Sequence, residues 1–248
     1  MNKTAIEWCD YTWNPVTGCL HGCPYCYARK IAERFKGSKA WPTGFKPEAR
    51  PDRLKEPRKL GTKWNCPESM AKGSTIFVCS MADLFGEWVP PGWIWDTFAA
   101  MDAAPRHTYI MLTKNPTKMA RFAPGPGDQP RGIQENWWFG ASVTCREDTR
   151  RIDNLQTRMS GSNRFISFEP LLGDPGPLDL TGIKQVIIGA QTNPDQYVGL
   201  EWVMKICEAA DKAGAKVFMK DSLAGRWPDR ELRRELAWPL NKSKTGGR

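Results

Sequence analysis

Six short apolar runs recur along the chain, and their starts lie 20 to 33 residues apart. Each run is rich in β-branched or aromatic residues, and most of them are apolar at nearly every position. Such runs are typical of strands buried on both faces, as in a parallel sheet. We therefore predict strands within 74–80, 107–113, 136–143, 164–170, 184–191 and 215–221.

Helical periodicity fills most of the intervals between these runs. We expect helices beginning at Pro91 and Pro116, a helix after a Thr144–Glu147 capping box, and a helix over 200–213 that ends at Gly214. The interval 171–183 contains too many Gly and Pro for a helix and predicts a loop. Alternation of strand and helix at this spacing indicates an α/β fold, either a doubly wound sheet or a barrel.

Two segments fall outside this alternation. Residues 36–67 show little periodicity and many prolines and charges, which indicates a basic insertion of loops and short helices. Residues 226–248 predict a short helix at 229–237 followed by a frayed tail. We expect the remainder, 1–225, to form one domain.

The charge of the chain is concentrated. The net charge is +9 over 248 residues, and the segment 29–63 alone holds 12 Lys or Arg against 4 Asp or Glu. This segment, with Trp41 inside it and Trp64 directly after it, suits a DNA or RNA backbone with bases stacked on the rings; a solvated basic loop is the alternative. No apolar run is long enough for a membrane span, and the polar start lacks a signal peptide, so we expect a cytoplasmic protein without membrane contact.

The segment 18–27, here called the cysteine loop, carries the clearest chemistry. It reads GCLHGCPYCY, with cysteines spaced C-x3-C-x2-C. Three thiolates in one loop can hold an iron–sulfur cluster and leave one iron without a protein ligand. A structural zinc site is the alternative, with His21, Cys9 or Cys66 as the fourth ligand.

The cysteine loop followed by strand–helix repeats resembles the radical S-adenosylmethionine (SAM) superfamily. The stretches TAIEWCDYTWNPVTGC, SMADLFGEWVP, LTKNP and SFEPLLG resemble an uncharacterised, phage-associated branch of it. This resemblance runs from Thr4 to about Asp221 and implies a partial (β/α) barrel of about six or seven mostly parallel strands. It also implies a host-cell cytoplasmic location if the protein is phage-encoded.

The resemblance further implies the cofactors. A [4Fe–4S] cluster would be bound by Cys19, Cys23 and Cys26, with SAM on the free iron. Reductive cleavage of SAM would give a 5′-deoxyadenosyl radical that abstracts hydrogen from the substrate. An external electron donor is required, either a flavodoxin-like protein or dithionite in vitro.

Polar residues at the carboxyl ends of the predicted strands supply the remaining candidates, because functional side chains of parallel barrels gather there. This chain has Ser80-Met81-Ala82-Asp83 and Gly189-Ala190-Gln191 where relatives tend to carry Gly-Gly-Glu. The candidates for SAM binding are Tyr25, Ser80, Asp83, Ser142, Glu169 and Gln191. The catalytic candidates are Lys114, Lys220 and Cys145.

These observations lead to one favoured function and two alternatives. We favour a radical SAM enzyme that modifies a nucleic acid or nucleotide, because the basic segment directly follows the cysteine loop. The alternatives are radical chemistry on a small molecule or peptide, and a zinc-stabilised nucleic-acid-binding module.

Overall fold

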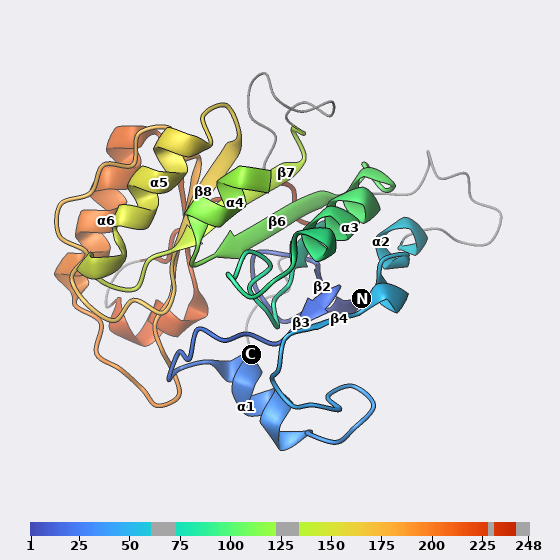
Figure 1. Cartoon of the computed structure of the whole chain (residues 1–248). Helices are drawn as coiled ribbons and strands as arrows, with labels where there is room; N and C mark the ends of the chain where they lie inside the picture. The colour runs from blue at the N-terminus through green and yellow to red at the C-terminus, as the bar shows by residue number, and fades with distance from the viewer. Residues whose placement is uncertain (61–72, 123–133, 228–230, 242–248) are drawn as a thin grey trace.

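The computed structural model describes residues 1–60, 73–122, 134–227 and 231–241, which form an α/β fold around an eight-stranded sheet (Figure 1). The strand order is β1-β2-β5-β6-β7-β8-β9-β10, and every neighbouring pair is parallel except β1 and β2. A separate antiparallel pair joins β3 to β4. The strands are β1 (Asn2–Lys3), β2 (Tyr11–Trp13), β3 (Val16–Thr17), β4 (Glu48–Ala49), β5 (Thr75–Val78), β6 (Thr108–Thr113), β7 (Trp137–Ser142), β8 (Asn163–Phe168), β9 (Gln185–Ile188) and β10 (Lys216–Met219).

All six predicted strands are confirmed, as β5 to β10. The predicted count of six or seven was too low, because β1 and β2 also join the sheet and are too short to show an apolar run. The sheet order begins at β1 and ends at β10, so the sheet is open and compatible with a partial barrel.

Four helices pack on one face of the sheet, here called the helical face (Figure 1). They are α3 (Pro91–Asp102), α4 (Pro116–Phe122), α5 (Arg150–Arg158) and α6 (Leu200–Ala213). Two helices occur earlier in the chain, α1 (Tyr27–Arg34) and α2 (Glu56–Lys59). Short 3-10 turns are found at η1 (Pro51–Arg53), η3 (Arg146–Asp148) and η4 (Asp221–Arg226). No helix in the described part of the chain is long and apolar enough to cross a membrane.

The predicted helices are confirmed, with one change at a helix start. Gly214 ends α6 in the left-handed conformation at φ 70°, as expected for a C-terminal glycine. The predicted capping box is wrong: the Thr144 hydroxyl donates to Asp148 at 2.7 Å, and α5 begins only at Arg150. The interval 171–183 contains no helix, as predicted.

Alternate strand residues face the two sides of the sheet. Ile76, Tyr109 and Ile166 belong to the core under the helices, whereas their neighbours in sequence belong to a second cluster on the opposite face. Gly140 leaves room on that face, since a Cβ there would collide with the Phe165 ring. The strand residues of the opposite-face cluster are Phe77, Ile110, Trp138, Phe165, Ile187 and Phe218.

The C-terminal segment covers part of this opposite face. Residues 231–241 contain no helix, so the predicted helix at 229–237 is wrong over its described part; residues 228–230 and the tail 242–248 lie outside the described residues. Arg234 forms an isolated bridge with Phe218 of β10, and Ala237 N donates to the Gln185 side chain at 2.8 Å. Trp238 then packs against Trp138 at a ring-centroid distance of 4.9 Å. The segment therefore adds to the sheet in extended form.

Candidate active site

The cysteine loop is attached to the carboxyl edge of the sheet, meaning the edge formed by the carboxyl ends of the parallel strands. Gly18 N donates to Met81 O at 3.0 Å, just beyond β5, and Cys19 N donates to Phe45 O at 3.2 Å. Gly18 has φ +84°, and a Cβ there would collide with the backbone of Lys46, so only glycine fits. The loop is thus held between the end of β5 and the backbone at residues 45–46.

The three thiols belong to the same ten-residue loop. Burial raises the pKa of Cys19 to about 11, and the charges of Asp83, Cys23 and Cys26 act in the same direction. Cys26 is the N-cap of α1, where its sulfur accepts from Arg29 N at 3.3 Å. Within the described residues, no group of three or more His, Cys, Asp or Glu side chains is already arranged around a metal position. The thiols therefore supply a donor set, and a bound metal would have to offset the burial that favours the protonated form of Cys19.

Two of the three ligands considered for zinc, His21 and Cys9, are engaged elsewhere in the described residues. His21 Nε2 is 2.7 Å from Asp83 Oδ2, and its ring packs on Trp88 at 4.8 Å. Cys9 is buried in the opposite-face cluster. Cys66 lies outside the described residues.

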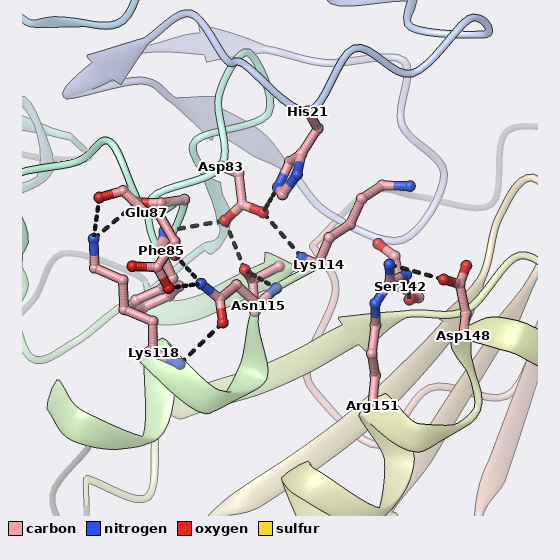
Figure 2. Close-up of polar contacts among 12 residues, drawn as sticks. His21, Asp83, Phe85, Glu87, Lys114, Asn115, Lys118, Ser142, Asp148 and Arg151 are labelled. Carbon is pink, nitrogen blue, oxygen red and sulfur yellow. Dashed lines mark hydrogen bonds and ion pairs between the residues drawn. The ribbon is translucent and has the colours of Figure 1, made fainter.

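Asp83 joins the cysteine loop to two strand ends (Figure 2). Its Oδ1 accepts from the Thr113 hydroxyl at 2.7 Å and from Phe85 N at 3.0 Å. Its Oδ2 accepts from Lys114 N at 2.9 Å and contacts His21. Burial acts to raise the pKa of Asp83, but hydrogen bonds from His21, Lys114 and Thr113 outweigh it and hold the pKa below its usual value. Since a carboxylate has about four acceptor positions, Asp83 has none left for a cofactor amine.

The loop that carries Asp83, residues 80–90, is fixed from α4. Lys118 Nζ donates to Gly86 O and Val89 O, each at 2.8 Å. It also donates to Glu87 O at 3.2 Å, and Figure 2 shows Lys118 beside Glu87. Asn115 caps α4 by accepting from Lys118 N at 3.1 Å and donates to Glu87 Oε1 at 2.6 Å. The stretches SMADLFGEWVP and LTKNP are therefore two halves of one support for the cysteine loop.

Ser80 is held by a residue that the sequence did not single out. Asn14, which directly follows β2, accepts from the Ser80 hydroxyl at 3.3 Å and from Met81 N at 2.8 Å. Its place immediately after a strand was the available signal, but β2 is too short to be predicted. The Ser80 hydroxyl is thus engaged within the protein.

Lys114 approaches the cysteine loop from the end of β6. Its Nζ donates to the Tyr25 hydroxyl and lies 5.0 Å from the centroid of that ring. Burial acts to lower the pKa of Lys114, but the bond to Tyr25 and the charges of Tyr25 and Cys23 outweigh it, so the pKa is raised. Tyr25, predicted to bind SAM, and Lys114, predicted as a catalytic candidate, therefore contact each other. Lys114 is a fixed cation beside Cys23.

Glu169 and Lys220, at the ends of β8 and β10, form an ion pair. The hydroxyl end of Tyr27 lies near this pair, although the residue as a whole is 53% exposed. Burial of the hydroxyl and then the charge of Glu169 raise the pKa of Tyr27 to about 12, and the hydroxyl donates to Ser80 O at 2.8 Å. Gln191 turns away toward its own loop, where its side-chain amide donates to Pro194 O at 2.9 Å. The pair lies beside α1, and Gln191 is engaged in a local turn.

Ser142 and Cys145 follow β7. Arg151 donates to Ser142 O at 2.8 Å and pairs with Asp148 at 2.8 Å, which fixes the start of this loop (Figure 2). The pKa of Cys145 is raised by burial and by Glu147, which disfavours the thiolate required of a nucleophile. Ser142 has a side chain without a protein partner in the described residues, whereas Cys145 lacks an activating group.

The basic segment divides between the two edges of the sheet. Arg50 and Arg53 donate to the backbone at Ala40 and Asn14. The part with Lys55, Arg58 and Lys59 lies at the amino end of β6, where His107 contacts Pro57 O at 3.0 Å. Helix α1 and the loop after it adjoin the carboxyl edge, as does Arg53, because Asn14 directly follows β2. Trp41 packs against Phe45 at 6.3 Å, and Trp64 lies outside the described residues.

The comparisons with known proteins add a family but no activity. A family model described as a protein of unknown function, DUF5131, matches residues 3–246. No curated protein and no solved structure matches the chain. Because the match covers nearly the whole sequence, the chain belongs to the DUF5131 family.

Proposed function

We propose that this protein is a radical SAM enzyme that acts on a nucleic acid or nucleotide. The observation that carries the proposal is one short loop with three thiols that is held at the carboxyl edge, with Cys26 capping α1. The donor set fits a [4Fe–4S] cluster, because the loop offers three sulfur ligands and no fourth. When bound, the cluster would supply the electron that cleaves SAM to methionine and a 5′-deoxyadenosyl radical.

The protein residues around the loop have supporting tasks. The Asp83–His21 contact orients the loop, and Lys114 places a positive charge beside Cys23 and Tyr25. The side chains of Ser142 and of the Glu169–Lys220 pair remain the candidates for polar contacts to SAM or substrate. Support of this kind is what such chemistry asks of a protein, since the cofactor performs the reaction and the protein positions it.

Anaerobic reconstitution with iron and sulfide tests the cofactor assignment. We expect brown protein with roughly four irons per chain and the broad visible absorbance of a [4Fe–4S] cluster. Colourless protein that contains stoichiometric zinc after purification would instead support the zinc-stabilised binding module. Incubation of the reconstituted enzyme with SAM, dithionite and DNA, RNA or nucleosides, followed by mass spectrometry, then tests the substrate class.

A further inference from the structure

Helix α1 has an apolar side that the protein does not cover. Ala28 and Ala32 pack against Phe45 on the inner side. Tyr27, Ile31 and Phe35, the residue that caps the C-terminus of α1, are spaced four residues apart and are 53%, 41% and 51% exposed. An exposed helix face is normally polar. These three residues, here called the α1 stripe, are half of the six large hydrophobic residues that are exposed in the described part of the chain.

The α1 stripe starts at the candidate active site. Tyr27 directly follows Cys26, and its hydroxyl reaches Ser80 O at the end of β5. Lys30 Nζ donates to Asn193 O at 3.3 Å, so the loop between β9 and α6 lies beside the same helix. With four residues per repeat, the stripe runs ~12 Å outward from Tyr27 to Phe35. It therefore leads from the surface to the carboxyl edge.

Cations surround the α1 stripe. Residues 27–47 contain six Lys or Arg and a single acid, Glu33. The Glu33 carboxylate turns inward and accepts from Phe45 N at 3.0 Å. Lys30, Arg34, Lys36 and Lys39 are exposed, and none of them forms an ion pair with a described residue. The Arg34 guanidinium lies 5.5 Å from the Phe35 ring centroid.

We infer that the α1 stripe and its cations form the entry surface for unpaired nucleotides. The Tyr27 and Phe35 rings, with the cations Lys30 and Arg34 between them in the sequence, suit the bases and phosphates of a strand. Stacking on a ring requires an exposed base face. A duplex hides those faces, so the ligand is a single strand or a nucleotide turned out of its helix. This inference rests on the proposed function and names its substrate class.

The structure supplies matched controls for the test. Lys55 and Arg58 belong to the same basic segment but lie at the other edge of the sheet, near His107. Trp95 is an exposed aromatic residue on α3, 39% exposed. Neither belongs to the candidate active site. Charge reversal at α1 can thus be compared with charge reversal at Lys55 and Arg58. Loss of the exposed Phe35 ring can be compared with loss of the exposed Trp95 ring.

The experiment measures fluorescence anisotropy of labelled DNA of ~16 nucleotides, single-stranded or duplex, with the full chain at low salt. We expect Phe35→Ala to weaken single-strand binding ~5- to 150-fold, the equivalent of one lost base stack, and Trp95→Ala to leave it unchanged. Lys30→Glu with Arg34→Glu should flatten the salt dependence, while Lys55→Glu with Arg58→Glu should not. Circular dichroism verifies that each variant is folded.

The outcomes separate this inference from the proposed function. Equal binding of single strand and duplex, or unchanged binding by Phe35→Ala, would overturn the inference. A third result would also overturn it. Stripe variants could keep oligonucleotide binding and dithionite-driven SAM cleavage but lose the cleavage that is driven by an acidic electron-carrier protein. The α1 stripe would then be the binding surface for that carrier. Absence of SAM cleavage in the reconstituted wild type would overturn the proposed function and leave the binding result standing.

Discussion

At the scale of single residues, Asp83 shows what a sequence can and cannot reveal. Its position after a strand correctly predicts a place at the carboxyl edge. The sequence could not show that four donors already surround it, because they come from residues 21, 85, 113 and 114. Its saturated carboxylate makes it a support for the cysteine loop, and its predicted contact with SAM stays a prediction.

Replacement of Asp83 by Asn should destabilise the protein. The amide nitrogen takes the place of one acceptor oxygen and faces donors, so at least one buried hydrogen bond to a charged group is lost. We expect urea unfolding to show a loss of ~1.5–3 kcal/mol. Asp96→Asn, at an exposed carboxylate on α3, should stay within ~0.5 kcal/mol. Equal stability of the two variants would show that the Asp83 network contributes nothing.

The lowered pKa of Asp83 also predicts a pH dependence. A carboxylate with a depressed pKa contributes stability that is present above the unfolded-state value of ~3.9 and is lost as the pH falls through the folded-state value. Wild-type stability should therefore fall below pH ~4 more steeply than that of Asp83→Asn, as measured by urea unfolding at each pH. Parallel curves would contradict the assignment of the charge to Asp83.

At the scale of elements, sequence patterns predicted the strands that are buried on both faces of the sheet. They failed for segments whose conformation depends on a few individual contacts. Strands β5 to β10 carry apolar runs because both faces of the sheet are covered. Strands β1 and β2 are too short for such runs. The capping box failed because the Thr144 hydroxyl found Asp148 instead. The helix predicted at 229–237 failed because contacts to β9 and β10 hold residues 231–241 extended.

The loop at 80–90 gives a prediction at this scale. Lys118→Met keeps the length of the side chain but removes the donor for three backbone carbonyls. Because buried acceptors without partners are costly, we expect a loss on the order of 3 kcal/mol in urea unfolding. Lys212→Met, on the exposed surface of α6, is the matched control and should change stability by less than ~0.5 kcal/mol. A loss no larger than that of the control would mean that Lys118 does not hold the loop.

At the scale of the whole molecule, the two edges of the sheet have different tasks. The carboxyl edge carries the cysteine loop and nearly every predicted site residue, as the rule for parallel strands led us to expect. The charge count did not reveal that the basic segment is shared between both edges, because that depends on how α2 packs near His107. The C-terminal segment closes the opposite face of the sheet with Trp238.

A substitution at Trp238 tests whether the C-terminal segment is part of the core on the opposite face of the sheet. It is 4% exposed and packs against Trp8, Trp138 and Phe165, so Trp238→Ala should cost ~3–5 kcal/mol in urea unfolding. Trp95→Ala removes a far more exposed ring and should cost clearly less. Similar losses for the two variants would show that the C-terminal segment is not part of the core.

The central claim is that the cysteine loop holds the cluster that cleaves SAM. The most direct measurement is the yield of 5′-deoxyadenosine from anaerobically reconstituted protein with SAM and dithionite. Wild type and Cys207→Ala, which changes a half-buried thiol on α6, should both form it. Cys19→Ala, Cys23→Ala and Cys26→Ala should each form none, because the cluster loses one of three thiolates. Wild-type yield from any of these three variants would contradict the account.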